Sequence, residues 1–392
     1  MKRYLSIITF IFLILGIIAG IYMPDFLNEI SFIGDYYISI LKIFIGPVIF
    51  LSIASTIYKT SIKKDRLILK SIITFVVMFI MTFLLTSLIV TIINPSKGLT
   101  YESDYSQIIE FDIGKMIINL FPKNLNDIFI NPKLFFIIVV AYLFGKTSSH
   151  FKADKMFEVI DKIYGFISKI FEYFIYITPL AVFVLIGAAV AKNGTALLST
   201  GLKYVLVAWV CGIICLFVVM ILPVYFISKM SPLEYIKKIY RIWMISISTC
   251  SSVVCLPHTL KICKEELKID ESISDVVVPL GCTIHMCGGA VSFSLLGLFC
   301  AGLYGIDINI YTYILMIISS LLINMAAPGI PGGGIVIGAS YLQLLGIPLG
   351  FIGFYSGIYK FLDMCYTTLN VTGDISANMI INSLEYRQNK SS

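Results

Sequence analysis

Apolar runs of about 20 residues recur along almost the whole chain, and they restrict its fold more than any other feature. The first run, residues 4–23, is long enough to cross a bilayer as a helix. Hydrophobic residues make up 58% of the chain and charged residues only 13%, with a mean hydropathy of +0.93. Because soluble domains carry roughly 25% charged residues, this composition excludes an ordinary soluble protein. We therefore predict an all-α polytopic membrane protein.

Positive charges gather in every second loop between the apolar runs. The loops after the second, fourth and sixth runs are basic, whereas those after the first and third are acidic or mixed. Basic loops stay in the cytoplasm, so the N-terminus and a C-terminal tail at residues 386–392 are predicted to be cytoplasmic. The expected location is the inner or plasma membrane. The net charge of +6 then reflects topology, and no nucleic-acid partner is expected.

The nine cysteines lie mostly inside apolar runs and lack both paired loop spacing and a zinc-type Cys-x-x-Cys motif. A disulfide framework is therefore not expected. No small-residue cleavage site follows the first run, so we expect it to be a spanning helix rather than a signal peptide. The sequence contains no nucleophile–base pair and no metal-protease motif. We expect neither an enzyme nor a bound cofactor.

Two segments in the second half of the chain interrupt apolar runs with helix-breaking residues. Residues 245–257 contain five hydroxyl side chains, and residues 326–335 contain two prolines and four glycines. Irregular backbone at membrane depth is tolerated only where it is buried in protein or lines a cavity. Each segment is therefore predicted to be the tip of a re-entrant hairpin. Paired interruptions of this kind point to the binding site of a transporter.

A spanning run, residues 276–303, lies between the two predicted hairpins, and a final apolar run follows the second hairpin. The order hairpin, span, hairpin, span suggests two repeats. In total we expect about eight spanning helices plus two re-entrant hairpins.

The final apolar run contains a polar segment, residues 363–374. Asp363, Thr367, Asn370 and Asp374 follow one another at spacings of 4, 3 and 4, which places them on one face of a helix. Ionisable groups are rare at membrane depth and usually face a cavity or a bound ion. Carboxylate and amide oxygens also suit hard cations. This face is therefore predicted to be a binding site.

Four motifs in this order resemble those of the sodium:dicarboxylate symporter family, which includes the glutamate transporters. They are the serine-rich segment that ends at Pro257, residues 279–289, the glycine-rich residues 329–334, and residues 363–374. The resemblance implies a glutamate-transporter-like homotrimer in the lipid bilayer. It also implies cation-coupled symport of an amino acid or related small carboxylate, by an elevator-type movement. Residues 1–230 would be mainly scaffold, and residues 231–385 a mobile transport core. The third span and part of the fifth run are candidates to join the transport part.

The resemblance also implies two sets of site residues. Those implied to contact the small-molecule substrate are Ser251, Ser252, Gly289, Ile330, Gly334, Asp363, Tyr366, Thr367 and Asn370. Those implied to bind the coupling ion, Na+ and/or H+, are Gly281, Thr283, His285, Met286, Asn324, Met325, Ala327, Asn370 and Asp374.

Plainer roles stay open for several of these residues. Asp363 would hold the ammonium group of an amino acid, since a buried charge needs a partner, but it would also suit a pair with a scaffold residue. Asn370 would equally join two helices through its amide. Ser251 and Ser252 would bind a carboxylate at a helix start or bond their own helix. The glycines at 332–334 would form a hinging tip or simply break a helix.

The sequence departs from the family pattern at the position that distinguishes acidic from neutral substrates. Members that carry acidic substrates have an arginine three residues after the aspartate matched by Asp363, and this chain has Tyr366. A phenol cannot form the bidentate pair that a guanidinium forms with a carboxylate. We therefore expect a neutral amino acid to be preferred over glutamate or aspartate.

A second group of departures concerns the coupling ion. Met78, Phe79, Cys287 and Tyr359 replace oxygen ligands of the family, which removes one deep sodium site. His285 replaces an asparagine, and its imidazole titrates near neutral pH. It would then carry a proton, or serve as a neutral helix-packing residue. The nearby cysteines are more often small apolar fillers than ligands, so a transition metal is not expected.

Three classes of function fit this pattern. A secondary transporter is favoured by the two hairpins and the polar final helix. An ion or solute channel would use the same polar midplane without strict coupling. A transport-deficient sensor or scaffold of the same fold would suit the loss of cation ligands.

Overall fold

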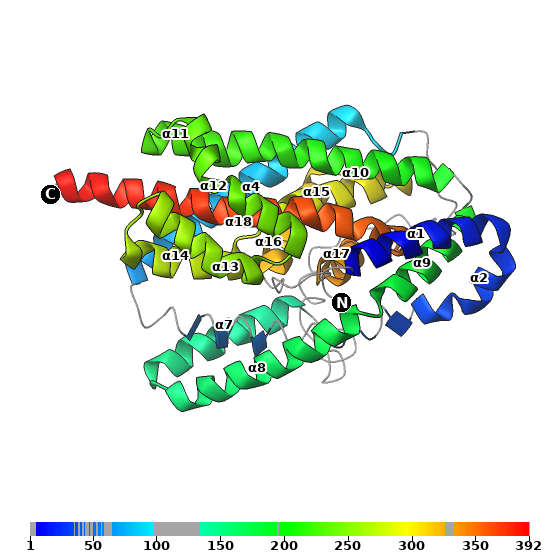
Figure 1. The fold of residues 1–392 in the computed structure, drawn as a ribbon, viewed down its shortest axis with the longest axis horizontal. Coiled ribbons are helices and arrows are strands. Elements are labelled where there is room, and N and C mark those ends of the chain that lie inside the picture. Colours follow the sequence, from blue (N-terminus) through cyan, green and yellow to red (C-terminus); the bar gives the residue numbers. More distant parts are fainter. Residues whose placement is uncertain are drawn as a thin grey trace.

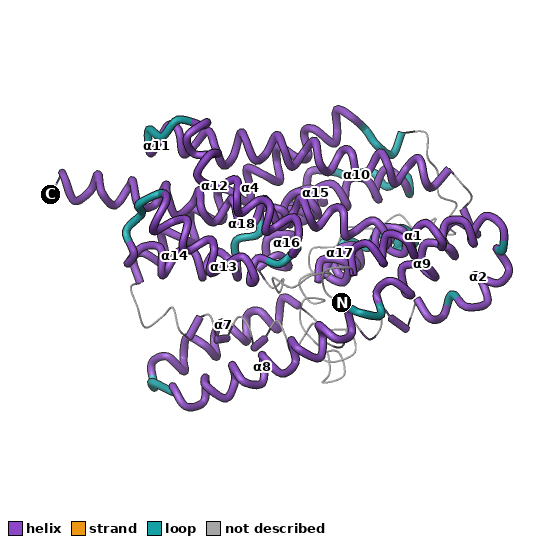
Figure 2. Tube along the Cα trace, in the orientation of Figure 1, coloured by secondary structure: helices purple, strands orange, loops and turns teal. Residues whose placement is uncertain are grey.

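The computed structural model describes residues 5–34, 65–97, 134–193, 196–325 and 333–391, together with parts of residues 36–58. Every regular element in these described residues is a helix, as Figures 1 and 2 show. The labelled helices are α1 (Leu5–Tyr22), α2 (Pro24–Ile30), α4 (Asp65–Ile93), α7 (Leu134–His150), α8 (Asp154–Ile175), α9 (Thr178–Asn193), α10 (Ala196–Cys215), η2 (Leu216–Ile221), α11 (Leu222–Ser228), α12 (Pro232–Thr249), α13 (Ser252–Lys261), η3 (Ile262–Glu266), α14 (Glu271–Ile284), α15 (Cys287–Leu303), α16 (Ile310–Met325), α17 (Gly333–Leu344) and α18 (Ile352–Ser391). The predicted all-helical class is confirmed.

Three stretches among the described residues are long and apolar enough to cross a bilayer: Arg66–Ile93, Gly201–Ser228 and Glu271–Leu303. A fourth arises if the bent pair Ile14–Tyr22 and Pro24–Gly34 is counted as one, although the chain turns by 116° between its two halves. The larger number of spans, and the number of hairpins, stay predictions.

Local sequence explains where two apolar runs end or break. The third run ends at Asn94, whose φ of 46° lies in the left-handed region that asparagine tolerates, and Pro95 follows. The fifth apolar run, residues 163–191, is divided between two helices, α8 and α9, which separate at residues 176–177. Pro179 lacks a backbone donor, so it fits the first turn of a new helix better than a helix interior.

Helix α18 forms the axis around which the second half of the chain packs (Figure 1). Its 40 residues extend over about 60 Å at 1.5 Å per residue, twice the roughly 30 Å of a hydrocarbon core. The helix contacts α9, α10, and each of α11–α15 and α17. The predicted tail at 386–392 continues this helix as far as Ser391.

Helix α9 packs between the α1–α2 pair and α18. On one side, a Cβ added at Gly16 would lie 2.6 Å from the Phe183 carbonyl oxygen, so α1 and α9 meet backbone to backbone. On the other side, Gly357 of α18 receives the side chain of Ile186. The first half of the chain therefore reaches α18 through α9, and also through α4, which contacts α18 directly.

The serine-rich segment breaks where the sequence predicts a break. Helix α12 ends at Cys250, which adopts a φ of 49°, and Ser251 then caps α13 by accepting a hydrogen bond from the Val254 backbone N–H at 3.4 Å. Helices α12 and α13 contact each other, as do α16 and α17. The predicted tip of the second hairpin, including Ala327 and Ile330, lies outside the described residues.

Candidate functional site

The run at residues 276–303, expected to be one continuous span, is two helices that separate at His285 and Met286. Gly288 and Gly289 follow after Cys287 and disfavour a helix interior. Side chains from two other helices satisfy the freed backbone groups. Asn324 Nδ2 donates to the Met286 carbonyl at 2.9 Å, and the Gly288 N–H donates to Asn370 Oδ1 at 2.7 Å. The break is therefore held by α16 and α18.

A polar cavity lies beside this break. Its volume is about 50 Å³, measured as the space open to the centre of a water-sized sphere, which exceeds the roughly 10–15 Å³ that one water needs. Its lining residues are Cys250, Ser252, Met286, Gly289, Ser292, Phe293, Asn324, Gly334, Ile337, Tyr359, Asp363, Tyr366, Thr367 and Asn370. The cavity thus joins the tip of α12–α13 to α15, α16, α17 and α18.

Most of the residues predicted to contact substrate line this cavity. They are Ser252, Gly289, Gly334, Asp363, Tyr366, Thr367 and Asn370. Ser251 is buried but caps α13 instead of lining the cavity, and Ile330 lies outside the described residues. The structure thus brings together residues from all four motifs, and their role in binding stays a prediction.

Asp363 is the one charged side chain among the described residues that line the cavity. It is 8% exposed and accepts a hydrogen bond from Thr367 Oγ1 at 3.2 Å. No arginine or lysine lines the cavity in the described part of the chain. The linking residues 326–332 contain neither type in the sequence. The cavity therefore offers one carboxylate and otherwise uncharged groups.

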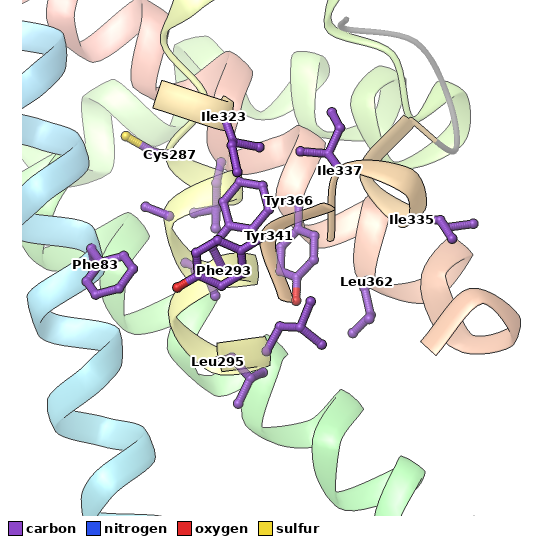
Figure 3. Close-up of a cluster of buried hydrophobic side chains, with 14 of the residues drawn as sticks. Phe83, Cys287, Phe293, Leu295, Ile323, Ile335, Ile337, Tyr341, Leu362 and Tyr366 are labelled. Atoms are coloured by element: carbon purple, nitrogen blue, oxygen red, sulfur yellow. The ribbon is translucent and has the colours of Figure 1, made fainter. Parts of the chain in front are cut away.

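Tyr366 occupies the position at which family members that carry acidic substrates have an arginine. Its ring is buried in the apolar cluster that also holds Phe293, Ile337 and Leu362 (Figure 3). Its hydroxyl makes no hydrogen bond to any described residue. The neighbouring Ser292 hydroxyl is paired with Tyr355 at 2.8 Å. The cavity therefore presents a phenol where a guanidinium would otherwise stand.

Two glycines bring cavity walls close together. A Cβ added at Gly289 would overlap Asn324 Oδ1, and one added at Gly334 would overlap the hydroxyl of Tyr359. Neither position accepts even an alanine without displacing a residue that lines the cavity. These glycines hold α15 against α16, and α17 against α18.

A second, denser cluster lies one helical turn further along α18. His285 Nδ1 lies 3.1 Å from Asp374 Oδ1, and His285 Nε2 lies 3.1 Å from Cys287 Sγ. The ring of Phe75 stacks on the imidazole with centroids 4.5 Å apart and planes 11° apart. A Cβ at Gly281 would overlap Asp374 Oδ1. The structure therefore gathers Gly281, His285 and Asp374, all predicted to bind the coupling ion.

The other residues of the cation set divide among three places. Met286, Asn324 and Asn370 line the cavity. Thr283 donates to the Pro279 carbonyl of its own helix at 3.0 Å. Met325 is the last residue of α16, and Ala327 lies outside the described residues. Asn370 thus contacts the helix break and the cavity at once.

Several residues of the site were missed by the sequence analysis. Phe75 comes from α4, and nothing in its sequence context distinguishes it from other apolar residues of that span. Tyr359, considered only as a lost ligand, lines the cavity, and its place four residues before Asp363 on one helix face was a usable indication. Lys360 stands beside the cavity residue Cys250. The sequence analysis did not identify Lys360 as a residue near the site.

Broken helices around a polar cavity in an apolar, all-helical chain are typical of one class of protein, the secondary transporters of membranes. The chain belongs to the sodium:dicarboxylate symporter family, whose model matches residues 5–384. This confirms the predicted family, with membrane transport, symport and cation coupling as its general properties. The family consists of transporters and not of enzymes.

Similar proteins span nearly the whole chain. A proton/glutamate-aspartate symporter of Bacillus subtilis (strain 168) is 24% identical over 398 residues, covering 98% of this chain and 96% of the relative. A proton/glutamate-aspartate symporter of Escherichia coli (strain K12) is 27% identical over 408 residues, covering 96% and 91%. A C4-dicarboxylate transport protein of Bacillus subtilis (strain 168) is 25% identical over 384 residues, covering 94% and 90%.

Proposed function

We propose that this protein takes up a neutral amino acid, or a related small carboxylate, by symport with Na+ or H+. The observation that supports this most is the charge of the cavity, where Asp363 is the one charged side chain among the described lining residues. A carboxylate in the lining suits the ammonium group that every amino acid carries. The relatives named above handle glutamate, aspartate and C4-dicarboxylates, so the proposed cargo differs from theirs.

The physical argument concerns the second carboxylate of an acidic substrate. Entering the cavity, it would lose its hydration beside Tyr366, whose phenol offers at most one neutral hydrogen bond. A hydrogen bond to a charged group contributes about 1.5–3 kcal/mol, so the missing guanidinium corresponds to roughly 10- to 150-fold in affinity. Lys360 lies beside Cys250 but outside the lining. The Lys360→Gln variant is therefore expected to transport the neutral substrate within about threefold of wild type.

The proposed coupling ion binds at Gly281, His285, Asn370 and Asp374. Asn370 and Asp374 supply side-chain oxygens one turn apart on α18, which suits a hard cation such as Na+. The second sodium site of the family does not fit this chain, because Met78 and Phe79 are buried apolar side chains there, 5% and 2% exposed. A proton on the His285–Asp374 pair is the other form of coupling. An unchanged pH dependence of uptake in His285→Asn would exclude that form.

The proposed mechanism moves a transport core, residues 231–385, against a scaffold formed mainly by residues 1–230, in elevator fashion. The position of α9 between the α1–α2 pair and α18 supports such a division. The third span, α4, would move with the core, because it contacts α14, α15 and α18. The C-terminal tail and the N-terminus would both face the cytoplasm.

A homotrimer is part of the proposal and is supported by one face of α8. Six exposed apolar side chains follow one another there at alternating spacings of 3 and 4: Met156, Val159, Ile163, Phe166, Ile170 and Tyr173. Phe166 and Tyr173 are the most open, 65% and 72% exposed. Such a stripe is the pattern by which helices of separate chains pack together. Treatment with a trifunctional thiol-reactive cross-linker, with one cysteine placed at Phe166 in each protomer, is expected to yield trimers and no larger species.

The direct test is uptake by the purified protein in sealed vesicles, with sodium and proton gradients imposed independently. Concentrative uptake of a neutral amino acid driven by one gradient is the expected result. Flux that only equilibrates the solute across the membrane would indicate a channel. Saturable binding without any flux would indicate a sensor or scaffold.

A further inference from the structure

The interface between α14 and α18 carries polar groups that neither the cavity nor the cation cluster uses. Beyond Asp374, residues Asn378 and Asn382 continue the same face of α18 at spacings of four. Asn378 Nδ2 donates to Ser274 Oγ at 3.0 Å, and Asn382 Oδ1 accepts from the Asp270 backbone N–H at 3.3 Å. The two segments run antiparallel here, because the later residue of α18, Asn382, pairs with the earlier residue, Asp270, and Asn378 pairs with Ser274.

We call this row the polar seam; its members are Asp374, Asn378 and Asn382 with Gly281, Ser274 and Asp270. Successive layers on α18 are four residues apart, about 6 Å along the axis at 1.5 Å per residue. A single water bridges two groups up to about 5.6 Å apart, since each of its hydrogen bonds extends about 2.8 Å. The spacing of the row is therefore close to that of a chain of alternating side chains and waters.

The middle layer contains an unsatisfied group. Asn378 is fully buried, and its Oδ1 accepts no hydrogen bond from any described residue. Its neighbours on α18, Ile375 and Met379, belong to a buried apolar cluster that also includes Val278 and Cys263. A buried amide oxygen among apolar side chains is unfavourable unless a water or an ion satisfies it.

Other polar residues of α18 at the same depth differ from Asn378. Ser376 is paired with the Tyr235 hydroxyl at 2.8 Å, and Thr372 Oγ1 accepts from Trp243 Nε1 at 2.9 Å. The unsatisfied oxygen therefore belongs to one face of the helix only. That face begins at the proposed cation site and ends at Asp270, an exposed residue.

We propose that the polar seam is a hydrated path along which a small monovalent cation moves between Asp374 and the aqueous phase at the C-terminal end of α18. The proposal rests on the cation site of the proposed function. It gives that site an exit separate from the substrate cavity, so the coupling ion and the cargo would leave by different routes.

Cys263 provides a native reporter for this path. Its thiol lies beside Asn378 and is 0% exposed. Cys300 on α15 is equally buried, within the main apolar cluster, and serves as the matched control. The silver ion is a monovalent cation that binds thiols. Adding Ag+ to the full-length protein and then alkylating the free cysteines after denaturation reports, by peptide mass spectrometry, which thiols Ag+ reached.

We expect Ag+ to protect Cys263 at least tenfold faster than Cys300. Asn378→Leu, which makes the middle layer apolar, is expected to slow protection of Cys263 at least tenfold. Ser376→Ala and the polar replacement Asn378→Ser are expected to stay within about twofold. Equal rates at Cys263 and Cys300 in the wild type would overturn the proposal, and so would a rate at Cys263 that Asn378→Leu leaves unchanged.

Competition by Na+ identifies the ion that uses the path. Slower protection of Cys263 in sodium nitrate than in choline nitrate supports a sodium path. Equal protection in the two salts, with the dependence on Asn378 retained, supports a path for protons carried by water. Neither measurement uses a transported substrate, so failure of this proposal is distinguishable from failure of the proposed function, which the vesicle uptake assay tests.

Discussion

The cavity and the His285–Asp374 cluster both lie along α18, yet they are built in opposite ways. The cavity is open space walled by glycines, with one carboxylate and a phenol whose hydroxyl has no partner among the described residues. In the cluster, Asp374 and Cys287 flank the imidazole and Phe75 covers it. Open space suits a cargo that enters and leaves, and dense packing suits a small ion.

The difference suggests that cargo and coupling ion are determined by separate positions on shared helices. Tyr366 changes the charge of the cavity, and His285 changes the donor set of the cluster. Asn370 lies between the two regions, since it lines the cavity, accepts from the Gly288 N–H at the helix break and precedes Asp374 by one turn of α18. Substitutions in the cavity should therefore change substrate binding, whereas substitutions in the cluster should change ion binding.

Removal of the cavity carboxylate should have the largest effect. Asp363→Asn leaves the shape of the side chain almost unchanged but removes the partner of a substrate ammonium group. A buried charge pair that loses one member costs about 2–5 kcal/mol, so binding of the neutral substrate should fall roughly 30- to 4,000-fold. Equilibrium binding of the radiolabelled substrate measures this. Thr367→Val is the control and should lose far less; an equal loss in the two variants would contradict the role given to Asp363.

Removal of the cluster carboxylate should act on the ion instead. Asp374→Asn is expected to weaken the apparent affinity for the coupling cation by roughly 10- to 100-fold, the range found when a metal ligand's supporting contacts are lost. At saturating cation, substrate affinity should stay within about threefold of wild type. Uptake measured as a function of cation concentration separates the two quantities. A comparable loss of substrate affinity at saturating cation would show that the two regions form one site.

Filling the wall of the cavity should have a smaller and repairable effect. Gly334→Ala would drive a methyl group into the hydroxyl of Tyr359, and overpacking of this kind costs about 1–3 kcal/mol. Substrate affinity should fall roughly 5- to 150-fold. The double variant Gly334→Ala/Tyr359→Phe removes the hydroxyl and should recover most of the loss in a double-mutant cycle. Strictly additive losses would mean that the two side chains do not meet in the working protein.

The two adjacent serines at the tip of α12–α13 should behave differently. Ser251 caps α13, and Ser252 lines the cavity. Ser251→Ala should therefore lower stability by about 1 kcal/mol and leave substrate affinity nearly unchanged. Ser252→Ala should lower affinity with little change in stability. Thermal unfolding and substrate titration on both variants check this, and the opposite assignment of effects would return Ser251 to the binding site.

The sequence was most informative where a feature depends on near neighbours along the chain. Helical spacing was enough to predict that Asp363, Thr367 and Asn370 share a face, and all three line the cavity. The serine-rich segment was enough to predict a break, which occurs at Cys250. Both features follow from local propensity and periodicity, which a single sequence contains.

Features that depend on packing were not predicted. The break at His285 and Met286 needs Asn324 and Asn370 from other helices to satisfy the backbone, and no local pattern reveals such partners. Phe75 meets His285 across 210 positions of sequence.

Competition between aspartate and asparagine tests the central claim most directly, because the two amino acids differ in charge but hardly in shape. Uptake of a labelled neutral amino acid into vesicles that hold the purified wild-type protein is measured with each as competitor. The charge of the cavity predicts that asparagine inhibits at a concentration at least tenfold lower than aspartate, and that Tyr366→Arg reverses this order. Stronger inhibition by aspartate in the wild type would contradict the account.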